Sequence, residues 1–166
     1  MKGMYFFMEK LGKQTIKFNN PPVITSTASI VGPKEANGPL AQYFDQCLDD
    51  EFWGEKTWEK SESKIIKETV NMCISKSNIP SSNIEYCFAG DLLNQCISSS
   101  FGLRGLNIPF LGIFGACSTF VEGLSLCAII VEACAQNAIC AASSHFCSAE
   151  KQFRFPLELG NQRPQT

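Results

Sequence analysis

A chain of 166 residues is long enough for one domain with a hydrophobic core. Its hydrophobic fraction of 45% and charged fraction of 18% argue against an intrinsically disordered protein. Its net charge of −2 argues against the broad positive surface that nucleic-acid binding requires. We therefore expect a globular protein that does not bind nucleic acid.

The cysteines argue for a reducing compartment and against a metal site. Most of the nine cysteines lie within apolar stretches, which is typical of buried free thiols. The chain has no C-x-x-C motif and one histidine, so we expect no metal and no cofactor. Charged residues interrupt the apolar run 4–8, and Asn107 and Pro109 interrupt the tract 105–121. We therefore expect neither a signal peptide nor a transmembrane helix.

The first half of the chain predicts one strand and one long helix. Residues 23–30 are rich in Val, Ile and Thr between two proline-containing turns, which indicates a strand. Residues 33–54 are expected to form a loop with a short helix at 40–48. From Trp58 to Ile74 apolar residues recur at helical spacing opposite a charged face, which predicts a surface helix over a sheet.

The second half alternates strands and helices. We expect strands at 84–89, 109–114 and 138–143, a helix near 94–103, and a helix at 118–134. The last helix is apolar nearly all round, which predicts burial on every side. This alternation favours an α/β fold with a mainly parallel sheet. Residues 153–166 are polar and contain prolines, so we expect no regular element there.

One cysteine lies where a reactive or binding group is expected. Cys117 stands in the sequence Phe114-Gly-Ala-Cys-Ser-Thr119, between a predicted strand and the apolar helix. Thr119 and Glu122 fit a capping box, which places the helix start here. Unpaired N–H groups at a helix N-terminus favour a negatively charged group. A cysteine in an apolar tract is otherwise an inert core residue, and this alternative remains open.

This strand-Cys-helix arrangement resembles the nucleophile elbow of the thiolase and ketoacyl synthase superfamily. Seven sequence blocks in order also resemble the stage V sporulation protein AD family of spore-forming Firmicutes. They begin with GPKE at Gly32, GPL at Gly38, AGDLLNQ at Ala89, IPFLGIFGACST at Ile108, SSH at Ser143, AEKQFRFP at Ala149 and GNQRP at Gly160.

The resemblance implies a layered, thiolase-like fold with a buried central helix. It also implies that residues 1–166 are the first of two pseudo-symmetric halves, truncated before the last core strand. In such proteins the strand at 109–114 pairs across a two-fold axis, so a full-length homodimer is expected. The family resemblance implies dipicolinic acid (pyridine-2,6-dicarboxylate) as ligand, other stage V A proteins as partners, and uptake into the developing spore. A soluble protein at the surface of the spore inner membrane is expected.

A dianionic aromatic ligand would require N–H donors, cations and an apolar slot. The candidate ligand-binding residues are Cys117, Ser118, Thr119, Asp91, Asn94, Gln95, His145 and Arg154. Each has a structural alternative: Asp91 and Asn94 could cap the chain after a strand, His145 could be structural, and Arg154 or Lys151 could be solvated.

The alternative function is that of an acyltransferase with Cys117 as nucleophile. Acyl transfer requires a base and an oxyanion donor around the thiol. His145 is the one histidine that could serve, and it lies on a different element. We therefore expect a binding protein without catalytic activity.

Overall fold

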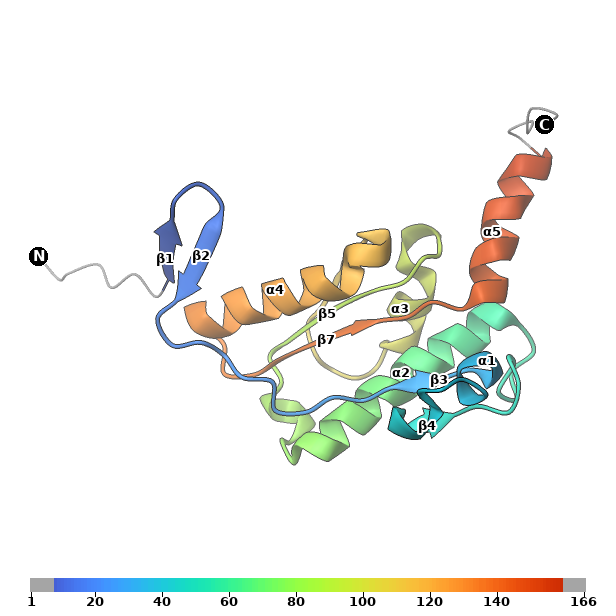
Figure 1. The fold of residues 1–166 in the computed structure, drawn as a ribbon, viewed down its shortest axis with the longest axis horizontal. Coiled ribbons are helices and arrows are strands. Elements are labelled where there is room, and N and C mark those ends of the chain that lie inside the picture. The colour runs from blue at the N-terminus through green and yellow to red at the C-terminus, as the bar shows by residue number, and fades with distance from the viewer. Residues whose placement is uncertain (1–7, 160–166) are drawn as a thin grey trace, which may run out of the picture.

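A three-stranded parallel sheet between helices forms the centre of the molecule. The computed structural model describes residues 8–159, and it describes their side chains except those of residue 95 and residues 153–159. The strands are β5 (Tyr86–Gly90), β6 (Phe110–Gly112) and β7 (Ala138–Ala142), in the order β6-β5-β7. Both pairings are parallel, which confirms the predicted sheet type. Figure 1 shows β5 and β7 running between helices α2 and α4.

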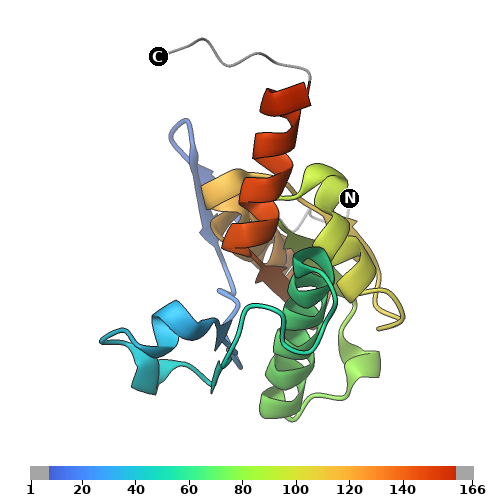
Figure 2. The same cartoon turned by 90° about the vertical axis from the view of Figure 1, so that its right-hand side faces the viewer.

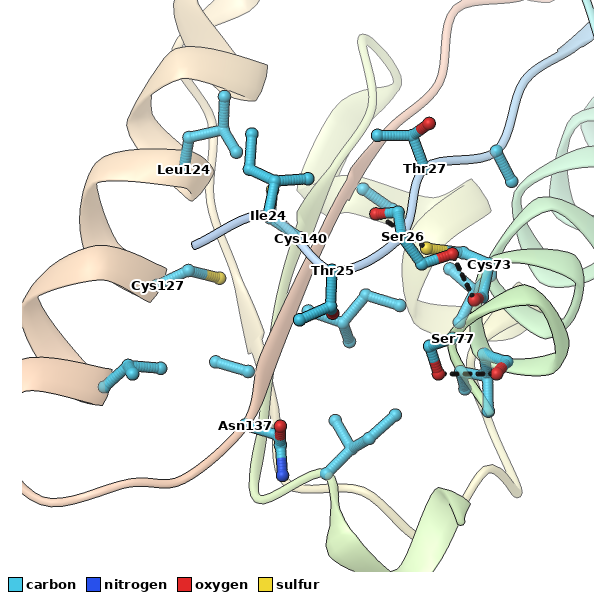
Figure 3. Close-up of a pocket in the computed structure, with 18 of the residues that line it drawn as sticks. Ile24, Thr25, Ser26, Thr27, Cys73, Ser77, Leu124, Cys127, Asn137 and Cys140 are labelled. Atoms are coloured by element: carbon cyan, nitrogen blue, oxygen red, sulfur yellow. Dashed lines mark hydrogen bonds between the residues drawn. The ribbon is translucent and has the colours of Figure 1, made fainter. Parts of the chain in front are cut away.

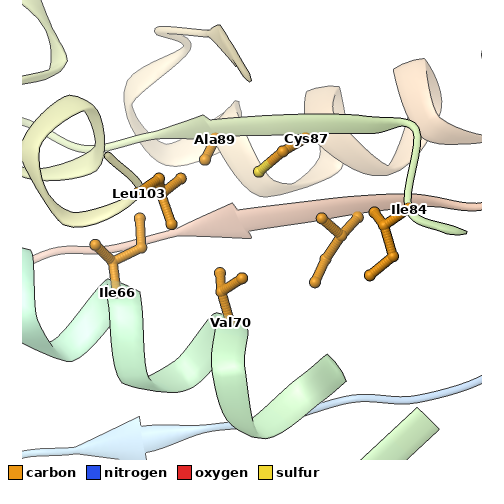
Figure 4. Close-up of a cluster of buried hydrophobic side chains, with 7 residues drawn as sticks. Ile66, Val70, Ile84, Cys87, Ala89 and Leu103 are labelled. Carbon is orange, nitrogen blue, oxygen red and sulfur yellow. The ribbon is translucent and has the colours of Figure 1, made fainter. Parts of the chain in front are cut away.

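Helix α2 (Trp58–Ser77) covers one face of the sheet as predicted. The Thr57 side chain accepts a hydrogen bond from the Lys60 N–H at 3.3 Å, and Asn78 ends the helix in the left-handed conformation. Its apolar stripe joins the sheet in a buried cluster (Figure 4). The cluster comprises Ile66, Val70, Ile84, Cys87, Ala89, Leu103 and Ile139.

Helix α4 (Thr119–Ala133) lies on the opposite side of the sheet, but its predicted burial on every side is wrong. Gly123 allows a close approach to β7, because an added Cβ would lie 2.9 Å from the Cys140 Cβ. Away from this contact, Phe120 is 51% exposed and Val121 is 63% exposed. The apolar pattern requires a cover on both sides, and the described chain covers one.

The same helix accounts for the one membrane-like stretch in residues 8–159. Ala116–Ala133 is long and apolar enough to cross a membrane, judged by length and composition alone. Core helices of water-soluble proteins pass the same test. The finding is weak evidence for a membrane span.

The strand predicted at 23–30 is mostly absent. Only its last residue enters β3 (Ile30–Val31), which pairs in parallel with β4 (Gln46–Cys47). Residues 21–29 form no strand, and Val23 and Ile24 are largely exposed. β-branched residues favour a strand only when a neighbouring strand supplies hydrogen bonds, and none lies beside residues 21–28 in the described chain.

Two features near the N-terminus differ from prediction. The unpredicted hairpin of β1 (Met8–Leu11) and β2 (Thr15–Phe18) turns at Gly12, whose φ is 61°. The expected helix at 40–48 is a single 3₁₀ turn, Ala41–Tyr43, while α1 (Pro33–Ala36) begins at a proline. Both segments are short, so their sequences carry too little periodicity to separate a helix from a strand or a turn.

The remaining helices lie around the sheet. Helix α3 (Ile97–Gly102) follows a 3₁₀ turn at Asn94–Cys96, in agreement with the predicted helical stretch. Helix α5 (Phe146–Leu159) projects away from the rest of the molecule in Figure 2. The prediction of an irregular segment is therefore wrong for 153–159, where good helix formers outweigh one proline. Residues 160–166, which include the GNQRP block, lie outside the described residues.

Candidate ligand site at the strand ends

The carboxyl ends of the three strands meet at one edge of the sheet. The Ser143 N–H, just after β7, donates to the Gly90 carbonyl at the end of β5 at 3.1 Å. Gly90 also packs directly on the segment after β6: an added Cβ would collide with the Ile113 carbonyl and lie 2.8 Å from Thr119 Cγ2. Ligands of open α/β sheets bind at such an edge.

A tight turn presents Cys117 at the start of α4. Ala116 has a φ of 48°, an uncommon conformation for a residue other than glycine. The Thr119 hydroxyl fixes the turn by accepting from the Gly115 N–H at 3.0 Å and donating to the Ala116 carbonyl at 2.9 Å. Cys117 and Ser118 are exposed, whereas Thr119 is buried. The turn therefore faces solvent with a thiol and a hydroxyl.

The predicted capping box at this helix is wrong. The helix begins at Thr119 with Ser118 as N-cap, and no side chain caps the first turn. The Thr119 hydroxyl is occupied within the turn, and the Ser118 hydroxyl donates to the Gly115 carbonyl at 2.8 Å. Both hydroxyl groups therefore form hydrogen bonds within the tight turn and are not available to cap the helix. The N–H groups of the first turn lack a side-chain partner among the described residues.

Asp91 stabilises the turn after β5. It is 2% exposed, and it accepts hydrogen bonds from the Leu93 N–H at 2.9 Å, the Ser99 N–H at 2.7 Å and the Ser99 hydroxyl at 2.6 Å. These contacts agree with the capping alternative. Ligand binding by Asp91 stays a prediction, and it would require exchange of these internal bonds.

His145 is also held inside the fold. It is 9% exposed, its Nε2 lies 2.7 Å from the Glu51 carbonyl, and its Nδ1 accepts from the Ser148 N–H at 3.4 Å. The contact with the carbonyl assigns the proton to Nε2. No hydrogen bond joins His145 to Cys117 within residues 8–159.

The other predicted ligand residues differ in what the structure describes. Asn94 is exposed at the start of the 3₁₀ turn after β5. The side chains of Gln95 and Arg154 lie outside the described part of the chain. Lys151 forms an ion pair with Glu59 at 2.8 Å on the surface. Among the described candidates, Cys117, Ser118 and Asn94 therefore face solvent.

The sequence analysis missed a buried carboxyl group below this edge. Glu62 of α2 is 1% exposed and accepts hydrogen bonds from Ser143 at 2.9 Å and Ser148 at 2.6 Å. The signal was present, because Glu62 lies four residues from both Trp58 and Ile66, on the apolar row of the helix.

Burial sets the protonation of this carboxyl group. Burial raises the pKa of Glu62 above its ordinary value of 4.5, and the nearby Asp91 charge adds to the rise. The two serine hydroxyls act in the opposite direction. Glu62 thus links α2 to both chain segments that follow β7 and titrates above the range of an exposed glutamate.

The thiols form no disulfide and no recognisable metal site in the described chain. All nine cysteines are free. No group of three or more His, Cys, Asp or Glu residues within residues 8–159 could hold a metal ion. Between α4 and β7, the interaction with the Cys140 thiol and burial raise the pKa of Cys127.

Comparison with known proteins identifies the family. A model of the stage V sporulation protein AD family matches residues 12–166. The chain belongs to the stage V sporulation protein AD family. It is 41% identical over 160 residues to the stage V sporulation protein AD of Bacillus subtilis (strain 168), a match that covers 96% of this chain. This confirms the resemblance found in the sequence blocks.

Membership in the AD family supports a role in sporulation and a spore-related location. The match covers 47% of the Bacillus subtilis relative, so the chain spans about half the length of that protein.

Proposed function

We propose that this AD-family chain binds dipicolinic acid and supports its uptake into the developing spore. It would act at the surface of the inner membrane with other stage V A proteins. The observation that carries the proposal is the family match over residues 12–166. The ligand has two carboxylates on an aromatic ring, so its site needs hydrogen-bond donors and an apolar surface.

The turn at Cys117 is the part of the structure that best suits a carboxylate. Helix α4 has 15 residues, and its first turn has no side-chain cap among the described residues. The partial positive charge of the helix start favours an anion there, while the Ser118 and Thr119 N–H groups already donate to the Gly115 and Ala116 carbonyls. The exposed Cys117, Ser118 and Asn94 would flank that anion. Arg154 remains the proposed cation.

We further propose that the chain is the first of two pseudo-symmetric, thiolase-like halves, with its last core strand outside residues 1–166. The bare side of α4 supports this, because Phe120 and Val121 lie on an apolar helix that needs a second cover. The exposed Leu111 and Phe114 near β6 support a homodimer of the full-length protein through that strand.

We propose that the chain binds its ligand and catalyses no reaction. Acyl transfer at Cys117 would need a base within hydrogen-bond reach of the thiol. Both ring nitrogens of His145 are occupied by Glu51 and Ser148. The acyltransferase alternative rests on the exposed thiol at the turn.

Calorimetric titration with dipicolinic acid tests the proposal. The purified chain is compared with a chimera in which it is joined to the part of the Bacillus subtilis relative outside the match. Picolinic acid, which lacks the second carboxylate, is the control ligand. We expect dipicolinic acid to bind the chimera, and Ser118→Ala to weaken binding by about fivefold, the value of one hydrogen bond. Ser82→Ala, before β5 at the opposite end of the strand, is the matched control.

Two results would contradict the proposal. If neither protein binds dipicolinic acid, this half carries no part of the site. If mass measurement after incubation with an acyl-coenzyme A shows an acyl group that Cys117→Ser removes, the acyltransferase alternative replaces it. Dipicolinic acid binding that survives Cys117→Ser would support a non-covalent site.

A further inference from the structure

The hairpin of β1 and β2 concentrates positive charge on a chain that is negative as a whole. Residues 8–18 include three lysines and one glutamate, whereas the whole chain has a net charge of −2. Lys10, Lys13 and Lys17 are all exposed. Glu9 forms a surface ion pair with Lys17 at 3.9 Å. The side of the hairpin nearest its turn, with Lys10 and Lys13, is therefore positively charged.

Two exposed apolar side chains lie beside these lysines at the tip of the hairpin. Leu11 is 42% exposed and directly precedes the turn at Gly12, and Ile16 is 48% exposed. Ile16 lies opposite Lys10 in the strand pairing, and Leu11 lies opposite Thr15. Opposite residues share a face and consecutive residues alternate, so Leu11 and Ile16 point to different faces. A flat contact would cover one of them, whereas a contact through the tip covers both.

The fold holds this tip away from the rest of the molecule. Figures 1 and 2 show the turn projecting beyond the sheet and the helices. At the base, the carboxylate of Glu132, which is 8% exposed, accepts from the Asn19 N–H at 3.2 Å and the Asn20 N–H at 3.1 Å. The segment that follows is fastened to α2, because the Ser26 hydroxyl donates to the Cys73 carbonyl at 2.8 Å (Figure 3). The base is thus fixed, and the tip lies in solvent.

We infer that the tip of this hairpin binds the surface of a membrane that contains anionic lipids. The lysine ammonium groups complement the charge of lipid phosphates, and Leu11 and Ile16 would enter the boundary between headgroups and acyl chains. The inference deepens the proposed action at a membrane surface and does not depend on dipicolinic acid binding.

Two other roles of the hairpin fit less of its surface. Lysines on an exposed hairpin can prevent pairing with other strands. The exposed Leu11 and Ile16 would favour such pairing, so this role leaves them unexplained. An acidic peptide would pair with the lysines but would leave both apolar side chains in water. A lipid surface matches the charged and the apolar side chains together.

Vesicle flotation tests the inference with the unmodified chain. Vesicles of equal parts phosphatidylglycerol and phosphatidylcholine are compared with vesicles of phosphatidylcholine alone. We expect the anionic vesicles to bind the chain at least about tenfold more strongly at low salt, and added salt to weaken this binding by screening. Equal binding to both compositions, or no binding to the anionic vesicles, would overturn the inference.

Neutralisation of the lysines locates the contact. One variant carries three substitutions in the hairpin: Lys10→Gln, Lys13→Gln and Lys17→Gln. The matched control makes the same change at three exposed lysines in or just before α2: Lys56, Lys60 and Lys67. The hairpin variant should bind anionic vesicles at least about tenfold more weakly, because each lysine near such a surface contributes roughly fivefold. The control should stay within about twofold of the unmodified chain. Equal losses in both variants would show attraction to dispersed charge and would overturn the inference.

A fluorescent reporter tests the same contact without removing charge. Ile16→Trp adds an indole at the tip, and the unmodified chain, with Trp53 and Trp58, gives the background emission. On anionic vesicles the added emission should shift to shorter wavelength and be quenched by brominated acyl chains, because an indole at the membrane interface leaves water. Added emission that is neither shifted nor quenched would place the tip in water and overturn the inference.

The two proposals can fail independently. A chimera that binds dipicolinic acid but no anionic vesicles would overturn the hairpin contact and retain the ligand proposal. A chimera that binds the vesicles through its hairpin lysines but does not bind dipicolinic acid would do the reverse.

Discussion

Helices α2 and α4 lie on opposite faces of one sheet, and they differ in how far the chain covers them. Helix α2 has a charged face and an apolar stripe, and the stripe is buried at Ile66 and Val70. Helix α4 is apolar on most sides, yet Val121 is 63% exposed. An amphipathic sequence pattern predicts which face of a helix is buried. A uniformly apolar pattern predicts burial on all faces, but it does not show that the same chain provides the elements that bury them. The difference places the exposed apolar helix surface of the described chain on α4.

The largest expected effect contrasts a covered and an uncovered residue of these helices. Ile66→Ala in α2 should lower the free energy of unfolding by about 3 kcal/mol, because it removes buried methyl groups and leaves a cavity. Val121→Ala in α4 should change it by less than about 0.5 kcal/mol. Urea unfolding followed by circular dichroism measures both. Similar losses for the two variants would mean that α4 is covered in solution, for example by self-association.

The next contrast concerns close backbone approaches. A Cβ on Gly102 of α3 would collide with the Ser63 carbonyl of α2, and a backbone group cannot move aside. Gly102→Ala should therefore cost about 2 kcal/mol. A Cβ on Gly123 of α4 would meet mainly the Cys140 and Ile113 side chains, at 2.9 Å and 3.3 Å. Gly123→Ala should cost about 1 kcal/mol, less than Gly102→Ala, because relieving a 2.9 Å contact with the Cys140 Cβ needs a smaller shift than relieving the collision with the Ser63 carbonyl, and the higher helix propensity of alanine offsets part of the cost. The opposite order in urea unfolding would contradict this account.

Sequence patterns predicted the elements whose partners lie within the chain. The stripe of α2, the strands at the centre of the sheet and the position of Cys117 before α4 could all be predicted from local periodicity. The strand at 23–30 could not, because strand formation needs a hydrogen-bonded neighbour and only Ile30 of this stretch has one in the described chain. The environment of Asp91 and His145 was also inaccessible, since their partners Ser99 and Glu51 are fixed by tertiary contacts. Glu62 was predictable from its spacing but was overlooked.

A smaller contrast concerns the two helix starts. The Thr57 hydroxyl caps α2 by accepting from the Lys60 N–H, so Thr57→Ala should cost about 1 kcal/mol. The Ser118 hydroxyl donates to the Gly115 carbonyl and caps nothing in α4, so Ser118→Ala should cost only a few tenths of a kcal/mol. Thermal unfolding of both variants measures the difference. An equal or larger loss for Ser118→Ala would show that its hydroxyl holds the turn at Cys117.

The smallest net effect on stability is expected for a substitution of Glu62, because burial of its carboxyl group and its hydrogen bonds with Ser143 and Ser148 act in opposite directions. Because burial raises the pKa of Glu62, the folded chain binds a proton more readily than the unfolded chain. The protonated carboxyl therefore contributes stability that is fully present below pH 4.5 and is lost as the pH rises through the raised pKa. Glu62→Gln removes this pH-dependent loss of stability, because the amide does not ionise. The amide oxygen, however, accepts weaker hydrogen bonds from the Ser143 and Ser148 hydroxyl groups than a carboxylate does.

Urea midpoints measured from pH 4.5 to neutrality should thus shift in favour of Glu62→Gln as the pH rises. The exposed Glu35→Gln variant is the matched control and should follow the unmodified chain. If Glu62→Gln instead loses stability relative to the unmodified chain as the pH rises, the hydroxyl groups of Ser143 and Ser148 outweigh burial. In that case the covered face of α2 would be stabilised by a buried carboxylate, and the contrast with α4 would rest on polar as well as apolar contacts.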